Sequence, residues 1–237
     1  MEPRSMLWGL VGTALAAAAG QPDGQQAGLG AAETTANGVP LSTRAYWMRR
    51  ANQALAEVLG TPCPFEAFGA VIVNHSAGGL GEAVCIGANM RSLTGDHTMH
   101  GEVAAMRNCS AILTDPAGAH RLTPAAALAA FSDLSLYTTG ESCPMCASAV
   151  AWARFGEYVY GTSVAAMVRL GWRHVRMSSR DVLRLAFDFD GAPPVGAIVP
   201  DVLANETDPF LAWQYDRAAP CPGGCVRAGG SCAVPVG

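Results

Sequence analysis

Two short segments of the chain combine residue types that can hold a metal ion. His100-Gly-Glu102 comes first, and Cys143-Pro-Met-Cys146 follows it. Zinc binds imidazole nitrogen and thiolate sulfur, and a catalytic zinc site has three protein ligands with a fourth position open to water. His100, Cys143 and Cys146 meet that number, so the sequence predicts one zinc ion per chain, held by these three side chains.

Glu102 follows the predicted histidine ligand by two residues. That is too close for a routine second ligand, but it places the carboxylate beside a water on the metal. Zinc lowers the pKa of a bound water to about 7, and a neighbouring carboxylate can take the proton and pass it to a leaving amine. The segment therefore predicts attack of zinc-bound hydroxide on an amine-bearing ring carbon, release of ammonia, and Glu102 as the proton shuttle.

The order His-x-Glu followed by Pro-Cys-x-x-Cys is typical of zinc deaminases, although Ser142 stands where that pattern has proline. Two other interpretations concern the same residues. Cys143 and Cys146 could form a disulfide or a thioredoxin-like redox pair. A closed structural zinc site would need a fourth ligand, for which His97 is the nearest candidate. The His-x-Glu upstream favours the catalytic interpretation.

Both segments are expected to begin helices. Pro144 suits a first helical position, and Cys-x-x-Cys spacing there puts both sulfurs on one side, at the positive end of the helix dipole. That end lowers thiol pKa values and favours the thiolate that zinc requires. A second helix beginning at His100 would bring another N-terminus to the same ion.

The remaining pattern predicts one α/β domain with a three-layer α/β/α arrangement, in which a central mixed five-stranded sheet has helices on both faces. Ser42 or Thr43 is expected to cap the first helix, and Gly60 to stop it. The predicted helices are 44–59, 100–113, a short one from 124, 144–154, 164–170 and 179–187. The predicted strands are 68–74 and 82–88, paired as a hairpin, then 134–138, 157–160 and 195–199.

The start of the chain resembles an export signal. Arg4 precedes a weakly apolar run that ends in three alanines before Gly20, which is the anatomy of a secretory signal peptide. We expect a signal peptide at 1–19, a flexible linker at 20–41, the zinc domain at 42–218, and a Cys/Pro/Gly-rich tail at 219–237. No segment is expected to span a membrane in the mature form.

Cysteines and glycosylation sequons agree with a secreted, extracellular protein. Six of the eight cysteines remain after the zinc pair, and six allow 15 pairings. Disulfides would order the tail, with Cys63 as one expected partner, whereas Cys85 and Cys109 could equally be buried free thiols. The three sequons begin at Asn74, Asn108 and Asn205, each a weak pattern alone.

The net charge of −4 in 237 residues argues against broad electrostatic binding of nucleic acid. The net charge does not exclude a local basic patch, because several arginines are distributed unevenly along the chain. They are Arg49, Arg50, Arg169, Arg173, Arg176 and Arg180.

With these residues in view, the chain resembles the cytidine deaminase-like superfamily, nearest the branch of guanine deaminases and tRNA adenosine deaminases, as a secreted, fungal-type member. The motifs that carry the resemblance lie within residues 44–162. They are Phe68-Gly-Ala-Val-Ile-Val73, Gly87-Ala-Asn89, Gly95–Val103 and Leu136–Cys146.

The resemblance implies a homodimer and further site residues. Asn89 would bind a ring carbonyl or nitrogen, since an amide both donates and accepts. The backbone near Ser142 would contact the leaving amine. Trp213 or Tyr215 would stack on a base or close a dimer interface, or simply pack. Guanine-specific relatives tend to carry an acidic residue after the fourth strand, where this chain has Ser163-Val-Ala-Ala166, which weakens a guanine assignment.

Three functions follow. The first is a secreted enzyme that deaminates a free nucleobase, a nucleoside or a related aminated heterocycle. The second is a deaminase of adenosine or cytosine in RNA or single-stranded DNA. The third is a secreted zinc-binding protein without enzymatic activity. The charge and the export signal favour the first.

Overall fold

The computed structural model describes residues 38–186 and 194–235. The predicted signal peptide lies outside the described residues, as does the predicted linker up to residue 37. Within the described part, no helix is both long and apolar enough to cross a bilayer.

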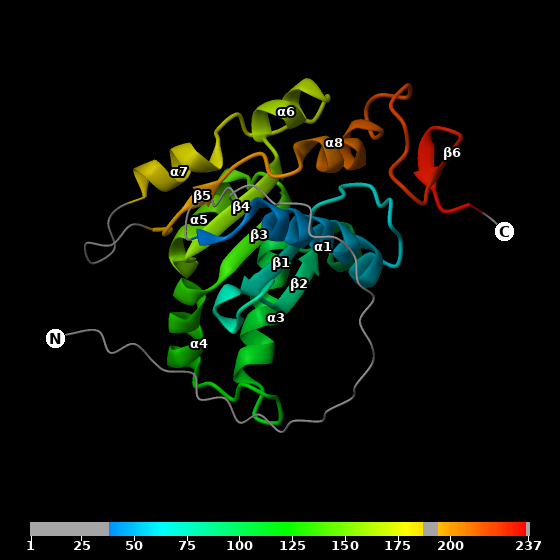
Figure 1. Ribbon diagram of the computed structural model, residues 1–237. Helices are drawn as coiled ribbons and strands as arrows, with labels where there is room; N and C mark the ends of the chain where they lie inside the picture. Colours follow the sequence, from blue (N-terminus) through cyan, green and yellow to red (C-terminus); the bar gives the residue numbers. More distant parts are fainter. Residues whose placement is uncertain (1–37, 187–193, 236–237) are drawn as a thin grey trace, which may run out of the picture. The chain divides into compact units, whose positions relative to one another are not determined.

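A mixed five-stranded sheet forms the centre of the fold, in the order β2-β1-β3-β4-β5 (Figure 1). β1 runs antiparallel to β2 and to β3, whereas β3, β4 and β5 are parallel. The predicted hairpin and the predicted mixed sheet are confirmed. The strands are β1 Gly69–Asn74, β2 Glu82–Ala88, β3 Ser135–Gly140, β4 Glu157–Thr162 and β5 Ile198–Val199.

Helices cover both faces of this sheet, which confirms the three-layer prediction. Trp47 and Met48 of α1 pack on one face against Val71 and Val159. On the other face, residues of α3, α4 and α5 pack with alternate residues of the same strands. The helices are α1 Leu41–Leu59, α2 Arg91–Thr94, α3 Gly101–Thr114, α4 Pro124–Ala130, α5 Pro144–Ala153, α6 Val164–Arg169, α7 Ser179–Leu185 and α8 Ala204–Ala212, with short 3-10 turns at His75–Ala77 and Phe131–Asp133.

The first helix begins earlier than predicted. Its N-cap is Pro40, which makes no side-chain cap bond, and its carbonyl already accepts from the Arg44 N–H at 3.1 Å. Ser42 and Thr43 therefore lie inside the helix, and the prediction that one of them caps it is wrong. The predicted stop is confirmed, because Gly60 adopts the left-handed conformation at the C-cap.

Two glycines allow α3 to approach the sheet closely. A Cβ on Gly87 of β2 would lie 2.3 Å from the backbone nitrogen of Ala105, and a Cβ on Gly101 would lie 2.6 Å from the carbonyl oxygen of Phe68. Such distances exclude a side chain at either position. The start of α3, and with it His100, is thus fixed against β1 and β2.

A fully buried ion pair joins α1 to β4. Arg44 binds Glu157 through two parallel bonds of 2.5 and 2.6 Å. The bidentate arrangement satisfies both charges, which a buried pair requires because each charge has lost its water. The pair fixes the position of α1 along the sheet.

Three disulfides account for the six remaining cysteines. Cys63–Cys225 and Cys221–Cys232 fasten the tail, which forms a small antiparallel hairpin, β6 Val226–Ala228 and β7 Ser231–Ala233. Cys85–Cys109 joins β2 to α3. The expected connection of the tail to Cys63 is confirmed, and the interpretation of Cys85 and Cys109 as free thiols is wrong.

Candidate active site

Helices α3 and α5 begin beside each other, at the end of the sheet where β3 ends. His100 is the N-cap of α3, Cys143 is the N-cap of α5, and Pro144 occupies the first helical position after it. The partial positive charge at each N-terminus favours thiolate at this point. The two helix starts thus converge as the sequence predicted.

The three predicted ligands lie within reach of one ion. The Nδ1 atom of His100 is 3.7 Å from the Cys143 sulfur and 3.6 Å from the Cys146 sulfur, and all three ligand atoms lie within 4.8 Å of one another. Usual zinc bond lengths in a tetrahedron put a sulfur and a nitrogen ligand about 3.6 Å apart. The donor set and its spacing therefore fit zinc.

The charges around these atoms suit a cation. Hydrogen bonding from Cys146 lowers the pKa of the Cys143 thiol to about 4, while the same contact raises the pKa of Cys146. Hydrogen bonding with Cys143 raises the pKa of His100. Of the two sulfurs, that of Cys143 therefore gives up its proton more readily.

Neither structural interpretation of the cysteine pair is supported. Cys143 and Cys146 are not joined by a disulfide. His97 is exposed and is not part of the metal-binding group. With three protein ligands, the group has the composition of an open zinc site.

Glu102 lies in the first turn of α3 and is buried. Burial is the main cause that raises the pKa of its carboxyl group, and the negative charge of Cys143 adds to the effect. A carboxyl group with a raised pKa holds a proton more readily, as a group that delivers one to a leaving amine must. Glu102 lies beside the predicted zinc ligands, as a proton shuttle must, and that role stays a prediction.

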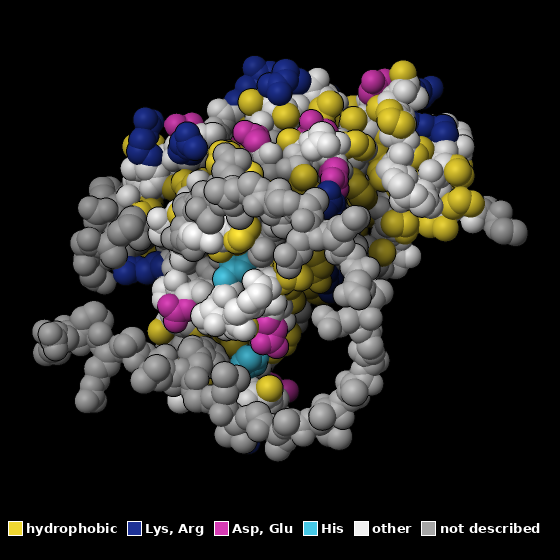
Figure 2. All heavy atoms as spheres, in the orientation of Figure 1, with side chains coloured by type: hydrophobic (Ala, Val, Ile, Leu, Met, Phe, Trp, Pro, Cys, Tyr) yellow, Lys and Arg dark blue, Asp and Glu magenta, His cyan; other side chains and the backbone are white. Residues whose placement is uncertain are grey.

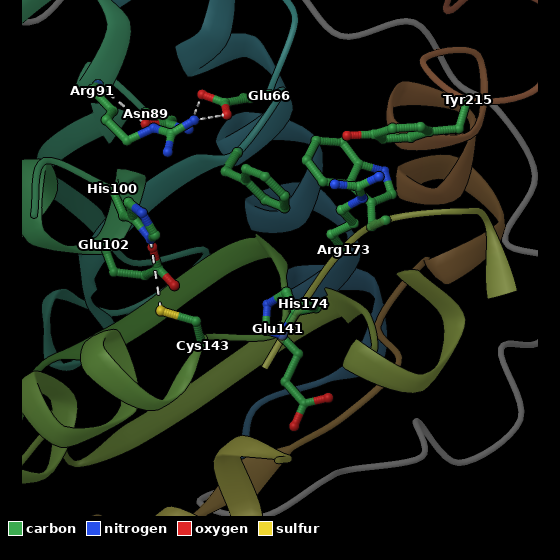
Figure 3. Close-up of a pocket in the computed structure, with 12 residues that line it drawn as sticks. Glu66, Asn89, Arg91, His100, Glu102, Glu141, Cys143, Arg173, His174 and Tyr215 are labelled. Atoms are coloured by element: carbon green, nitrogen blue, oxygen red, sulfur yellow. Dashed lines mark hydrogen bonds and ion pairs between the residues drawn. The ribbon is translucent and has the colours of Figure 1, made fainter. Parts of the chain in front are cut away.

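A pocket of about 300 Å³ opens over this cluster (Figure 3). His100, Cys143 and Glu102 line one side of it, and aromatic and charged side chains from other segments of the chain line the rest. The lining residues are Glu66, Phe68, Asn89, Arg91, His100, Glu102, Glu141, Cys143, Trp172, Arg173, His174 and Tyr215.

Of the residues expected to bind substrate, Asn89 and Tyr215 line the pocket. Ser142 is buried, does not line it, and donates its backbone N–H to the Tyr158 hydroxyl at 2.7 Å. Its N–H is therefore occupied within the protein. Trp213 is also absent from the pocket, because it packs with Cys63 and Cys232 beneath the tail. The structure thus favours simple packing for Trp213.

Sequence reasoning missed several wall residues. Glu66 and Arg91 form an ion pair in the wall, and Trp172 contacts Phe68 and Tyr215 edge to face, each at 5.1 Å. The available signals were weak. Arg91 follows Asn89 by two residues, and Trp172 lies in a segment without periodicity.

Glu141 holds one wall in place from behind. Its carboxylate accepts from the Val164 N–H at 2.7 Å, and from the N–H and hydroxyl of Ser179 at 2.7 and 2.8 Å. It thereby fixes the starts of both α6 and α7. The segment between these helices carries Trp172, Arg173 and His174 to the pocket.

Comparison with known protein families finds one that matches the part of the chain containing the predicted zinc ligands. The family described as "Cytidine and deoxycytidylate deaminase zinc-binding region" matches residues 41–162, just over half of the chain.

Two curated relatives are each 38% identical to parts of the chain. One is a tRNA(Ile)-lysidine synthase of Deinococcus radiodurans, matched over 95 residues, which are 40% of this chain and 13% of that protein. The other is a guanine deaminase of Bacillus subtilis, matched over 87 residues, which are 37% of this chain and 44% of that protein. The chain thus spans less than half the length of either relative.

Among solved structures, a variant of the protein NE0047 in complex with 8-azaguanine is similar with a TM-score of 0.50 and 15% identity. The similarity covers 70% of this chain and 81% of that one. At this identity the likeness concerns the fold.

Proposed function

The chain belongs to the cytidine and deoxycytidylate deaminase zinc-binding family, and on that basis we propose that it is a zinc-dependent hydrolytic deaminase of a small aminated heterocycle. The substrate would be a free nucleobase, a nucleoside or a related ring. One observation carries the proposal: a buried carboxyl group, Glu102, lies beside a His/Cys/Cys group at one side of a pocket of about 300 Å³.

The donor set, His100 with Cys143 and Cys146, would hold the zinc. When bound, zinc supplies a Lewis acid that activates water for attack at neutral pH. The Glu102 carboxylate takes a proton from the attacking water and returns it to the departing amine nitrogen, so that ammonia leaves as a neutral molecule. Burial of Glu102 keeps bulk water from competing for that proton.

The pocket supports a small substrate. Its volume of about 300 Å³ lies at the lower end of the range for small-molecule sites. Phe68 and Trp172 give it aromatic walls on which a flat ring can stack. The guanine deaminase among the relatives and the bound 8-azaguanine of NE0047 make purine-type rings the first substrates to try.

A polymer substrate has one observation in its favour. Arginines gather around α6 and α7, where Figure 2 shows basic side chains on the surface, and Arg173 continues this patch into the pocket. The exposed members are Arg169, Arg173, Arg176, Arg180 and Arg184. Affinity for a single-stranded oligonucleotide that falls steeply with salt would support this second function.

Export of the protein is part of the proposal. Three disulfides support it, because disulfides persist in oxidising compartments. Of the sequons, Asn74 is the last residue of β1, directly before the 3-10 turn at His75–Ala77, whereas Asn108 lies within α3 and Asn205 within α8, so Asn74 is the first site to test for glycosylation. The fungal-type origin stays a prediction.

A homodimer is also proposed. The face formed by α5 and α7 exposes Trp152 and Leu185, which are 72% and 66% accessible. Exposed apolar side chains that cluster often mark an interface. Light scattering should give twice the mass of the mature chain, and Trp152→Lys should return it to one copy.

The function is tested with the purified mature protein. We expect about one zinc ion per chain and release of ammonia from at least one member of a panel of aminopurines, aminopyrimidines and their nucleosides. Glu102→Gln should keep the zinc and slow turnover by a factor of about 10² to 10⁴. Glu82→Gln, on an exposed strand residue, is the matched control. Full turnover in Glu102→Gln would refute the mechanism. Zinc without ammonia release from any compound would favour the non-enzymatic function.

A further inference from the structure

Glu66 has an unusual backbone conformation for a residue with a side chain. Its φ is 56°, in the left-handed region that favours glycine, and such strain persists only where the surroundings enforce it. Here they do so on both sides. The Glu66 N–H donates to the Gln214 side-chain oxygen at 2.8 Å, and its carbonyl accepts from the Phe68 N–H at 2.8 Å. The carboxylate is thereby held in the pocket wall.

That carboxylate closes a network with two neighbours (Figure 3). One oxygen accepts from the Arg91 guanidinium, and the other accepts from the Asn89 side-chain nitrogen at 3.2 Å. The Asn89 side-chain oxygen accepts from the Arg91 backbone N–H at 3.1 Å. These three residues, called the Glu66–Asn89–Arg91 network below, therefore bind one another in a closed ring.

The network fixes which way the Asn89 amide points. An amide can turn by 180° and exchange its donor for its acceptor. In this network the turned amide would place its oxygen against the Glu66 carboxylate and its NH₂ against the Arg91 N–H. Both contacts would be repulsive, so the amide is confined to one orientation. One N–H of Asn89 is used by Glu66, and the second remains as a hydrogen-bond donor.

We propose that Glu66 is a positioning residue that makes Asn89 a hydrogen-bond donor toward the substrate, and so selects aminated rings with a carbonyl oxygen or an unprotonated ring nitrogen at that point. The inference rests on the proposed function, because it assigns a specificity to the same pocket. Glu66 acts through Asn89 and does not touch the reacting atoms. An analogue with N–H in place of the acceptor would face a second donor and bind poorly.

The orientation of Asn89 is tested without any substrate. Side-chain amide signals of Asn89 are followed by NMR in the zinc-loaded wild type, in Glu66→Ala, and in the control Glu82→Gln. We expect slow exchange with solvent in the wild type and the control, and exchange at least about tenfold faster in Glu66→Ala, since one bonded N–H is released. Equal exchange in all three proteins would overturn the proposal.

The effect on recognition is tested with 8-azaguanine as the probe, by calorimetry. Glu66→Ala should weaken binding about tenfold, equivalent to about 1.4 kcal/mol, and Glu66→Gln should recover most of this loss because its amide oxygen can still accept from Asn89. In an Asn89→Ala background, Glu66→Ala should have less than about a twofold further effect. Additive losses would show direct contact of Glu66 with the ligand and overturn the positioning role.

The two proposals fail separately. If the wild type neither binds 8-azaguanine nor releases ammonia from any ring, the proposed function is refuted, while the NMR comparison still decides how Asn89 is oriented. If Glu66→Ala loses its zinc or its fold, Glu66→Gln carries the test. The glutamine side chain in that variant still accepts from Asn89 but lacks the charge that binds Arg91. If exchange of the Asn89 amide is unchanged in Glu66→Gln while 8-azaguanine binds more weakly, the role assigned to Asn89 is contradicted.

Discussion

Glu141 binds Ser179 twice, accepting from its N–H at 2.7 Å and from its hydroxyl at 2.8 Å. The two residues are 38 positions apart, and the contact ties the turn before Cys143 to the first residue of α7. The residue that precedes the metal-binding turn thus also sets the position of the segment that closes the pocket.

Replacement of Glu141 should therefore reduce stability. In Glu141→Gln, the amide nitrogen would face an N–H group of Val164 or Ser179, and at least one charge-assisted bond would be lost. Such bonds contribute about 1.5–3 kcal/mol each, so we expect the free energy of unfolding to fall by about 3 kcal/mol. Urea denaturation measures it, with Glu82→Gln as the control. A loss below about 1 kcal/mol would show that Glu141 does not hold these helices.

Removal of the metal should destabilise the same region. Because only the folded chain brings His100, Cys143 and Cys146 together, zinc at a hundred times its dissociation constant stabilises the fold by about 2.7 kcal/mol. A strong chelator should lower the melting temperature of the wild type and leave that of Cys146→Ala almost unchanged. Equal responses of the two proteins to the chelator would exclude this cysteine as a ligand.

Loss of the disulfide at Cys63 should affect both stability and binding. Cys63–Cys225 spans 162 residues and Cys221–Cys232 spans 11, and loop closure predicts contributions of about 5 and about 3 kcal/mol, respectively. Cys63 also lies three residues before Glu66, in the segment that leads into the pocket wall. We expect the double variant Cys63→Ser/Cys225→Ser to raise KM several-fold.

The matched control is Cys221→Ser/Cys232→Ser, which removes a disulfide confined to the tail. It should lower the melting temperature less and leave KM near the wild-type value. Identical KM values in the two double variants would show that the Cys63–Cys225 disulfide does not influence the pocket.

His75 should make stability depend on pH. Burial lowers its pKa below the ordinary value of 6.5, so the unfolded chain takes up the proton at a higher pH than the folded one. The contribution of His75 to the free energy of unfolding should then be fully present above about pH 6.5. It should be lost as the pH falls from there toward the pKa of His75 in the folded chain. In His75→Gln this decline should be smaller between about pH 7.5 and about pH 5, as measured by urea denaturation. If His75→Gln shows the same decline in the free energy of unfolding as the wild type, groups other than His75 cause it.

The central sheet and the metal group were predictable because they depend on local patterns. Alternating and continuous apolar runs identify β1 through β4, and Pro144 marks the start of α5 whatever the rest of the chain does. His100, Cys143 and Cys146 are recognisable because zinc accepts few ligand types at few spacings.

The pocket wall was not predictable because it depends on contacts between distant segments. Glu66 reaches Arg91 only after a left-handed turn that nothing in the local sequence requires. Cys85 and Cys109 are joined because α3 lies against β2, with 5.2 Å between their Cα atoms. Helix α8 has a proline inside and no side-chain cap, so its local sequence argues against the helix that packing against β4 produces.

The disulfide between Cys63 and Cys225 has a consequence for how the protein responds to a protease. It closes a covalent circle that contains β1 to β5, the predicted zinc ligands and the residues that line the pocket. A protease that cuts the chain once anywhere within that circle leaves both pieces attached to each other. Such a nicked molecule would migrate as an intact chain until a reductant is added, and it would keep the segments that form its pocket together.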